Sequence, residues 1–167
     1  MHELLAYHYA LTDDPFYKPS KQEQSMSETQ STLKLTYQGA QKILNAAIAA
    51  ASEMGVPQCI SVVDQGGHLI AFARMDGAFS MSLETSLRKA QTAACYGVPS
   101  GDVEAGIDIR LAIGTDGKRI NLPGGLPIIV EGNLIGGIGV GSGTGAQDLV
   151  VAKAGVAVIS GSKHYQE

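Results

Sequence analysis

Cysteine is scarce in this chain of 167 residues, and no apolar run is long enough to cross a membrane. The two cysteines, Cys59 and Cys95, lie in apolar stretches predicted as strand and helix, without C-x-x-C spacing. We therefore expect buried, reduced thiols and no disulfide framework. A membrane helix needs about 18 or more consecutive apolar residues, and the N-terminus lacks the basic and apolar regions of a signal peptide. We expect a soluble, cytoplasmic protein.

Charge is sparse as well. Lysine and arginine form no cluster and the formal net charge is −4, which argues against contact with a phosphate backbone, so no nucleic-acid partner is expected. Charged residues make up 17% of the chain, below the roughly one quarter of an average domain, so exposed polar surface is limited. This favours a homo-oligomer with a buried subunit interface. The length and the 44% of hydrophobic residues fit one domain with a proper core.

Histidines are too scattered for a metal site. His68 is the one histidine inside the expected domain away from its ends, and no two histidines have the spacing of zinc ligands. A G-x-S-x-G motif is also absent, so nothing indicates a serine hydrolase. Two interpretations stay open for His68. Its ring nitrogen, like the Cys95 thiolate, can ligate haem iron, or the ring faces water at the edge of a hairpin.

The patterns that are present indicate one α+β domain between two short terminal segments. Residues 1–32 show no sustained period of 2 or 3.6 and are interpreted as an arm or extension, residues 33–162 as the domain, and residues 163–167 as a tail. Two hairpins without β-α-β crossovers predict a mainly antiparallel sheet flanked by helices. The expected strands cover residues 58–64, 68–75, 126–130 and 134–140, and the expected helices cover residues 37–54, from Ser80 or Ser82 to 96, and from the cap Thr144 to 160. Residues 108–121 show no clear pattern.

The second hairpin and its glycine-rich exit organise the domain. Its two apolar runs flank Glu131-Gly132-Asn133, a polar turn. The exit, Gly141 to Ala146, fits G-x-G-x-x-G/A, but the chain ends after the next helix, without the further strand and acidic residue of a dinucleotide fold. Free N–H groups at this helix start can hold a carboxylate or phosphate, or the glycines serve tight turning alone. Thr144 and Gln147 match a capping box.

Candidate site residues lie near the ends of these elements. Arg74 and Asp76 end the first hairpin, where Arg74 suits an anionic group, although the two can also pair with each other. Lys89 lies in the middle of a predicted helix, where a solvated side chain is the usual case. Gln147 and Asp148 fall in the first turn of the last helix, and each is explained either by capping and the helix dipole or by a pocket.

Several motifs in the same order resemble the GlcG/HbpS-like family, which includes the C-terminal domain of PduO-type proteins. They are Val62-Val-Asp-Gln-Gly-Gly-His-Leu69, Arg74-Met-Asp-Gly-Ala78, Lys89-Ala90 with Thr92-Ala93, Pro123-Gly-Gly-Leu-Pro127, and Ile135-Gly-Gly-Ile-Gly-Val140 followed by Gln147-Asp148. The resemblance covers about residues 33–160. It implies an α+β domain that assembles into homo-oligomers, with some members binding haem or related tetrapyrroles.

This chain departs from the family pattern at one place. Gly141 to Gly145 stands where the family usually has Ser-Gly-Gly or Ser-Gly-Ala, which alters the floor of the expected pocket. Haem ligation is not uniform in the family, so the resemblance assigns neither His68 nor Cys95 as an axial ligand.

The first functional hypothesis is a small-ligand binding protein, with haem as the candidate cofactor and no metal ion. Its pocket for a small anionic ligand lies between the Pro123 to Gly125 turn, the Arg74 end of the first hairpin and the start of the last helix. The expected binding residues are His68, Arg74, Lys89, Gly124, Gly125 and Gln147.

The alternative is a small cofactor-independent isomerase, hydratase or hydrolase that acts on an anionic carboxylate or an intermediate of aromatic catabolism. Arg74 would anchor the anion, and Asp76 or Asp148 would transfer the proton. A third interpretation is an oligomeric accessory subunit whose pocket is only a packing feature. The sequence leaves open whether the chain is an enzyme.

Overall fold

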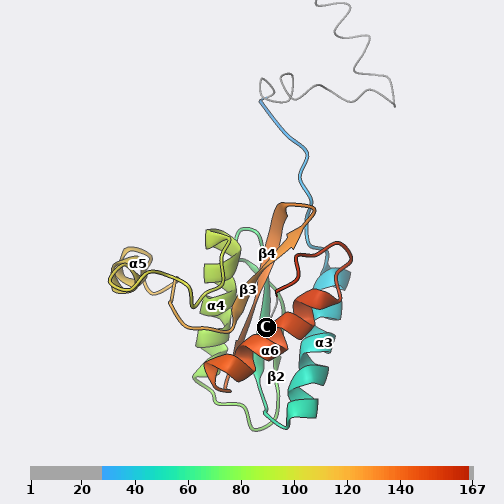
Figure 1. The fold of residues 1–167 in the computed structure, drawn as a ribbon, viewed down its shortest axis with the longest axis vertical. Coiled ribbons are helices and arrows are strands. Elements are labelled where there is room, and N and C mark those ends of the chain that lie inside the picture. The colour runs from blue at the N-terminus through green and yellow to red at the C-terminus, as the bar shows by residue number, and fades with distance from the viewer. Residues whose placement is uncertain (1–27, 166–167) are drawn as a thin grey trace, which may run out of the picture. The chain divides into compact units, whose positions relative to one another are not determined.

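The structure, a computed structural model, describes residues 28–165 (Figure 1). The chain divides into two units after Thr32, and every helix and strand of the described residues lies in the second unit, from Leu33 onward. Of the arm expected over residues 1–32, residues 1–27 lie outside the described residues, as do residues 166 and 167 of the expected tail.

The described strands form one antiparallel sheet in the order β2-β1-β4-β3. They are β1 (Cys59–Asp64), β2 (Leu69–Arg74), β3 (Gly125–Val130) and β4 (Asn133–Gly141). Each expected hairpin is present, and β1 joins the two by pairing with β4. The predicted α+β class with a mainly antiparallel sheet is confirmed.

The turn between β3 and β4 is one residue shorter than expected. Val130 and Asn133 already face each other as a pair, so the turn consists of Glu131 and Gly132. Both have positive φ values, 51° and 79°. Positive φ at both central residues is the requirement of a type I′ turn, whose twist matches that of the flanking strands. Glycine meets this requirement without strain at the second position.

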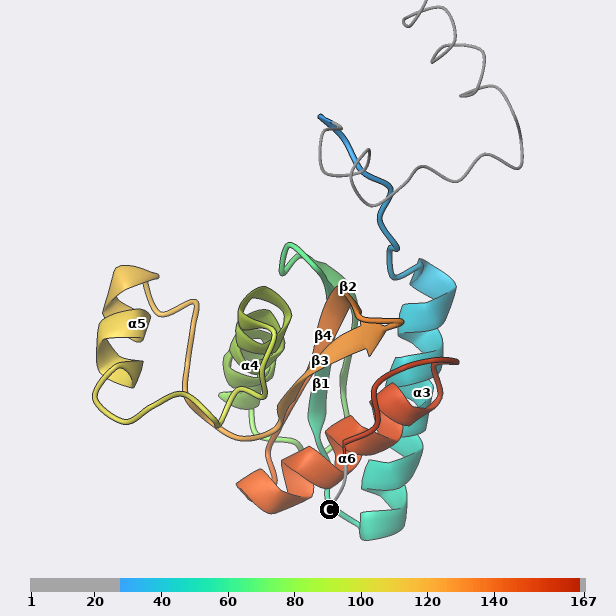
Figure 2. The ribbon, with the colours of Figure 1, turned by 45° about the horizontal axis from the view of Figure 1, so that its top comes forward.

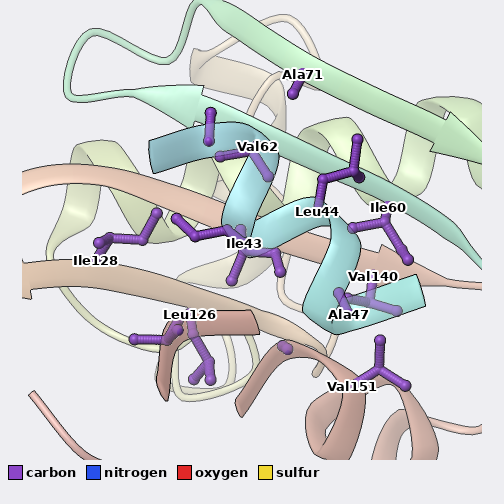
Figure 3. Close-up of a cluster of buried hydrophobic side chains, with 14 of the residues drawn as sticks. Ile43, Leu44, Ala47, Ile60, Val62, Ala71, Leu126, Ile128, Val140 and Val151 are labelled. Carbon is purple, nitrogen blue, oxygen red and sulfur yellow. The ribbon is translucent and has the colours of Figure 1, made fainter. Parts of the chain in front are cut away.

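Helices cover both faces of the sheet (Figure 2). On one face, α3 (Tyr37–Met54) and α6 (Gly145–Ala157) pack against each other and against the strands. On the other face, α4 (Ser82–Tyr96) packs over β4, β1 and β3. The main core lies under α3 and α6, where Ile43 and Val151 meet strand residues such as Ile60 and Val140 (Figure 3).

Local sequence explains two of the three predicted helix starts. The Thr36 hydroxyl accepts the Gly39 N–H at the start of α3, and Gly55 (φ 67°) ends that helix. The predicted capping box of α6 is present. The predicted start of α4 at Ser82 is confirmed, but no side chain caps it: Met81 precedes the helix without a side-chain hydrogen bond, and Ser82 lies buried in the first turn.

Two glycines of β4 bring α4 unusually close to the sheet. A Cβ atom on Gly137 would lie 2.6 Å from the Ala90 carbonyl oxygen, and one on Gly139 would collide with the Ser86 carbonyl oxygen. Ile138, between them, points to the opposite face and joins the core under α3 and α6. The alternation of glycine and apolar residues in β4 therefore reflects helix contact on one face and core packing on the other.

The structure adds one helix in the segment without a predicted pattern. This helix, α5 (Asp108–Gly114), has no buried residue and exposes Ile109 and Ile113. Its seven residues are too few for the strong apolar period that predicts longer helices. None of the helices in residues 28–165 has the length and apolarity of a membrane-spanning segment.

Candidate functional site

A cavity of about 530 Å³ lies between the Pro123-Gly124 turn, α6 and residues 163–165. Four apolar residues line it: Pro99, Pro123, Leu126 and Leu149. Three potential cations, Lys153, Lys163 and His164, line it as well, against a single acid, Asp102. This combination suits a ligand that has an apolar body and a negatively charged group.

The segment expected as a tail forms a wall of this cavity. The Lys163 N–H donates to the Ile129 carbonyl oxygen at 2.8 Å, and Ser162 forms a bridge with Val130. The Tyr165 hydroxyl donates to the Pro127 carbonyl oxygen at 2.7 Å. These contacts attach residues 162–165 to the free edge of β3, so Lys163 and His164 are held beside the cavity.

Burial of the Tyr165 side chain raises the pKa of its hydroxyl to about 12, so the hydroxyl is a neutral hydrogen-bond donor at neutral pH. The Lys163 ammonium lies 5.2 Å from the centre of the Tyr165 ring, within the range of a cation–π contact. The aromatic ring therefore helps to position one of the cations of the cavity.

Gly124 lines the cavity, and a buried ion pair lies directly behind it. Lys89 Nζ is 2.7 Å from Asp148 Oδ2 and 2.7 Å from the Val140 carbonyl oxygen. A Cβ atom on Gly124 would lie 2.6 Å from Asp148 Cβ and 3.2 Å from Lys89 Nζ, and the φ of Gly124 is 110°. Both the backbone conformation and the available space therefore require glycine here.

The interpretation of Lys89 as a solvated residue is wrong. Its side chain is 6% exposed and that of Asp148 is 3% exposed. The other Asp148 oxygen, Oδ1, accepts the Gly143 N–H at 2.9 Å. Turned so that its nitrogen faces these acceptors, the Gln58 amide donates to Asp148 Oδ1 and to the Gly141 carbonyl oxygen, both at 2.9 Å. Both carboxylate oxygens of Asp148 thus have donors.

Gln147 lies outside the lining of the cavity and acts in the helix cap. Its side-chain oxygen accepts the Thr144 N–H at 2.8 Å, and its own N–H donates to the Thr144 hydroxyl at 3.3 Å. Gly125 is also outside the lining, and its N–H donates to the Ser100 hydroxyl at 2.9 Å. Gly124 is thus the predicted binding residue that lines the cavity, with Lys89 directly behind it.

Arg74 and Asp76 are both exposed at the end of the first hairpin and do not line the cavity. Arg74 pairs across the sheet with Cys59, whose burial raises the pKa of the thiol while the Arg74 charge opposes that rise. The Phe79 N–H donates to the Ser142 hydroxyl at 2.7 Å, which connects the loop after Arg74 to the start of α6. The loop after Arg74 and the start of α6 are therefore close together, as expected, but the cavity lies elsewhere.

His68 lies at the opposite end of the sheet from Gly124. Its ring nitrogen Nδ1 is 3.1 Å from the Asp64 carboxylate, and its side chain is 82% exposed. Slight burial raises the pKa of Asp64, but hydrogen bonds from the His68 backbone and ring, the charge of His68 and the Gly66 N–H outweigh it and hold the pKa below its usual value. Asp64 pairs with Gly136, whereas the Gly124 carbonyl oxygen accepts the Val140 N–H. The stretch of β4 from Gly136 to Val140 therefore lies between His68 with Asp64 and the cavity at Gly124.

Cys95 lies beside the His68 turn, because a Cβ atom on Gly67 would be 3.2 Å from its sulfur. Cys59 is buried as expected, but Cys95 is exposed, so the expectation of a buried thiol is wrong for Cys95. Within residues 28–165, no three side chains of His, Cys, Asp or Glu come together in a group that can hold a metal ion.

Sequence reasoning missed the cations of the cavity. Lys153, Lys163 and His164 belong to no motif, and two of them lie in the segment interpreted as a tail. One signal was available: Pro127 interrupts the apolar run of β3, and proline in a strand is typical of a sheet edge. An edge strand near the end of the chain is a place where a terminal segment can attach.

Residues 35–157 match the family model of the haem-degrading protein HbpS-like family, and the chain belongs to this family. An uncharacterised 15.0 kDa protein of Citrobacter freundii, from the dhaT-dhaS intergenic region, is 38% identical over 133 residues, which are 77% of this chain and 94% of that protein. The predicted family is thereby confirmed.

Another relative shows the similarity to PduO. The corrinoid adenosyltransferase PduO of Citrobacter freundii is 29% identical over 137 residues, which are 79% of this chain and only 41% of PduO.

Two solved structures share the fold. Protein ORFY of Klebsiella pneumoniae has a TM-score of 0.75 and 31% identity, and the match covers 79% of this chain and 94% of that one. PduOC, solved as a complex with haem, has a TM-score of 0.73 and 27% identity, with 80% and 100% covered.

Proposed function

We propose that this protein binds a small anionic ligand with a large apolar body, and that the ligand is haem or a related tetrapyrrole. The observation that carries the proposal is the cavity of about 530 Å³, which is lined by apolar residues and by Lys153, Lys163 and His164. Cavities that bind small molecules usually enclose about 300–1,000 Å³ and are mostly apolar, with a few polar groups that fix the orientation.

The chemistry of the lining fits a tetrapyrrole. The macrocycle of haem is flat and apolar and suits the walls formed by Pro99, Pro123 and Leu149. Its propionate groups are anionic and suit the ammonium groups of Lys153 and Lys163. His164 supplies an imidazole in the same cavity, and imidazole nitrogen is a common axial ligand of haem iron. The solved complex of PduOC with haem supports this choice of ligand.

The enzymatic alternative has less support from the geometry. Asp148 has both oxygens bound by donors and is almost inaccessible, so it offers no free carboxylate for proton transfer. Arg74 and Asp76 do not line the cavity. The contacts therefore favour a binding protein over an enzyme. In this proposal the Lys89–Asp148 pair acts on the ligand only through its position behind Gly124.

Titration of the full chain with haemin tests the proposal. The expected result is a saturable shift of the Soret band. The double variant Lys153→Ala/Lys163→Ala should bind haemin about a hundredfold more weakly or worse, because hydrogen bonds to charged groups contribute about 1.5–3 kcal/mol each and every 1.4 kcal/mol is about tenfold in affinity. Lys42→Ala, which removes an exposed lysine of α3, is the matched control and should bind like the original chain.

A second pair of variants separates the two candidate histidines. His164→Ala should change the position of the Soret band of the complex, whereas His68→Ala should leave it unchanged. A haemin spectrum identical to that of free haemin would refute the proposed function. An altered band in His68→Ala with an unaltered band in His164→Ala would move the ligand from the cavity to the Cys95 end of the sheet.

A further inference from the structure

A second, smaller cavity adjoins the one described above. It encloses about 230 Å³ and lies along the last turns of α6, where Ala154, Val156 and Ala157 line it. Positions 149, 153 and 157 share one face of a helix. Leu149 lines the larger cavity, Ala157 the smaller one and Lys153 both, so the two cavities follow one another along α6. The residues that line both cavities are Lys153, Lys163, His164 and Tyr165.

The charged groups that line the smaller cavity are all basic. Lys153, Lys163 and His164 line it, and none of its described lining residues is acidic, whereas Asp102 lines the larger cavity. Lys163 and His164 are exposed and Lys153 is partly exposed, so an ion from solvent can reach them. Ammonium and imidazole N–H groups donate to the oxygens of anions. The lining therefore suits a small oxyanion.

The segment that carries two of these basic residues is held in place. The Lys163 N–H donates to the Ile129 carbonyl oxygen, and the Ser162 hydroxyl donates to the Val156 carbonyl oxygen of α6 at 3.0 Å. The Lys163 ammonium lies 5.2 Å from the centre of the Tyr165 ring, and the Tyr165 hydroxyl is itself bound to Pro127. The donors are thus held beside the cavity before a ligand binds, which lowers the entropic cost of binding.

The C-terminal end of α6 opposes an anion in this cavity, but its effect is smaller than that of the lysines. The helix dipole places about half a negative charge at this end. Two ammonium groups, each with a full positive charge, outweigh it. In addition, the Val156 carbonyl oxygen accepts both the Ser162 hydroxyl and the Ile159 N–H, the latter at 3.2 Å, so donors already bind it. The potential in the cavity is therefore positive.

We propose that the smaller cavity is a second binding site, for a small oxyanion such as phosphate or a carboxylate. Its volume of about 230 Å³ lies below the range of about 300–1,000 Å³ that is usual for drug-sized ligands. Its wall on α6 consists of two alanines, one valine and Lys153, which offers little surface to a large aromatic body. The site does not depend on which molecule fills the larger cavity.

Amide NMR of the full chain during titration with inorganic phosphate tests the site, at constant ionic strength and without other oxyanions. The Ala154 and Ala157 signals should shift and saturate at millimolar phosphate. Acetate is titrated in parallel: tighter binding of phosphate identifies a phosphate site, tighter binding of acetate identifies a carboxylate site, and either supports the proposal. Shifts that saturate with neither ion, or that sodium chloride reproduces, would overturn it.

Variants locate the bound ion. Ala157→Glu places a carboxylate at the smaller cavity and should weaken phosphate binding about tenfold or more, because like charges repel at short range. Val150→Glu adds the same charge at an exposed position of α6 that lines neither cavity, and should bind phosphate like the original chain. Lys163→Gln removes a cation but keeps the backbone N–H that holds the segment, so it should also weaken binding. Unchanged binding in either Ala157→Glu or Lys163→Gln would contradict the site.

The shared lysines connect the two cavities. Because Lys153 and Lys163 line both, an oxyanion and an anionic ligand of the larger cavity should weaken each other's binding by the same factor. This effect rests on the proposed function. The original chain should bind haemin severalfold more weakly with saturating phosphate than without it at equal ionic strength, and Ala157→Glu should show no such difference. Equal haemin affinities in the original chain would exclude the sharing of the lysines.

The second site and the proposed function can fail separately. A chain that does not bind haemin but gives saturable phosphate shifts refutes the proposed function alone. Haemin binding without saturable shifts from phosphate or acetate refutes the second site alone.

Discussion

Lys89 of α4 and Asp148 of α6 meet at 2.7 Å at the end of β4, although the two helices lie on opposite faces of the sheet. The ammonium also binds the carbonyl oxygen of Val140, and Asp148 also binds the loop before α6 through Gly143. One ion pair therefore connects both helical layers and the central strand immediately behind Gly124.

Asp148→Asn should strongly destabilise the protein. The substitution leaves the Lys89 charge buried without its partner, which costs about 3–5 kcal/mol. Urea denaturation measures the change in the free energy of unfolding. The matched control is Glu84→Gln, which breaks the exposed Arg88–Glu84 pair (3.3 Å) and should cost less than about 1 kcal/mol. Equal losses for the two variants would contradict a structural role for the buried pair.

Gly124→Ala should cost more stability than Gly132→Ala. Both positions have positive φ, 110° and 79°, so both variants incur backbone strain of about 1–2 kcal/mol. At Gly132 nothing lies within 4 Å of the added Cβ, whereas at Gly124 that atom would collide with Asp148 and Val140. Thermal unfolding of the two variants side by side measures the difference, and similar melting temperatures would refute the close packing of the ion pair against the turn.

Tyr165→Phe should change the alkaline limit of stability. The folded pKa is raised to about 12 from an ordinary value of 10.0, so this contribution to stability is fully present below pH 10 and is lost as the pH rises toward 12. The original chain should therefore lose more stability than Tyr165→Phe between these pH values. Tyr37→Phe, at a residue 64% exposed, is the control and should follow the original chain.

Asp64 should contribute to stability with the opposite pH dependence. Its folded pKa lies below the ordinary 3.8, so the contribution is present above that value and is lost as the pH falls through the folded pKa. NMR titration should find the Asp64 pKa below 3.8 and should find it higher in His68→Ala, because donors to the carboxylate are lost. An Asp64 pKa that is the same in both proteins would show that the His68 ring does not bind the carboxylate in solution.

The sequence predicts the strands well because their signals are local. Apolar runs and the polar turns between them lie within a few residues of one another, and the pairing inside each hairpin follows from them. The boundary at Asn133 differs because a turn can be one residue shorter than its polar run.

The site is predicted less completely because its contacts are distant in the sequence. The pairing of Lys89 with Asp148 spans 59 residues, and no local pattern distinguishes a buried lysine of this kind from a solvated one. Residues 163–165 join the cavity only because the β3 edge is near them in space. Gly124 can be predicted because it belongs to an unusual local motif. The residues that lie near it in space belong to no such motif and cannot be predicted in this way.

Gly137 and Gly139 set the distance between α4 and the sheet, and this distance has an effect at the cavity. Lys89 is carried by α4, so its ammonium reaches Val140 and Asp148 only while the helix keeps its present height above β4. A side chain at either glycine would lift the helix and withdraw the positive charge from behind Gly124. Substitutions in the middle of a strand can therefore alter the electrostatics of the cavity while every residue that lines it stays the same.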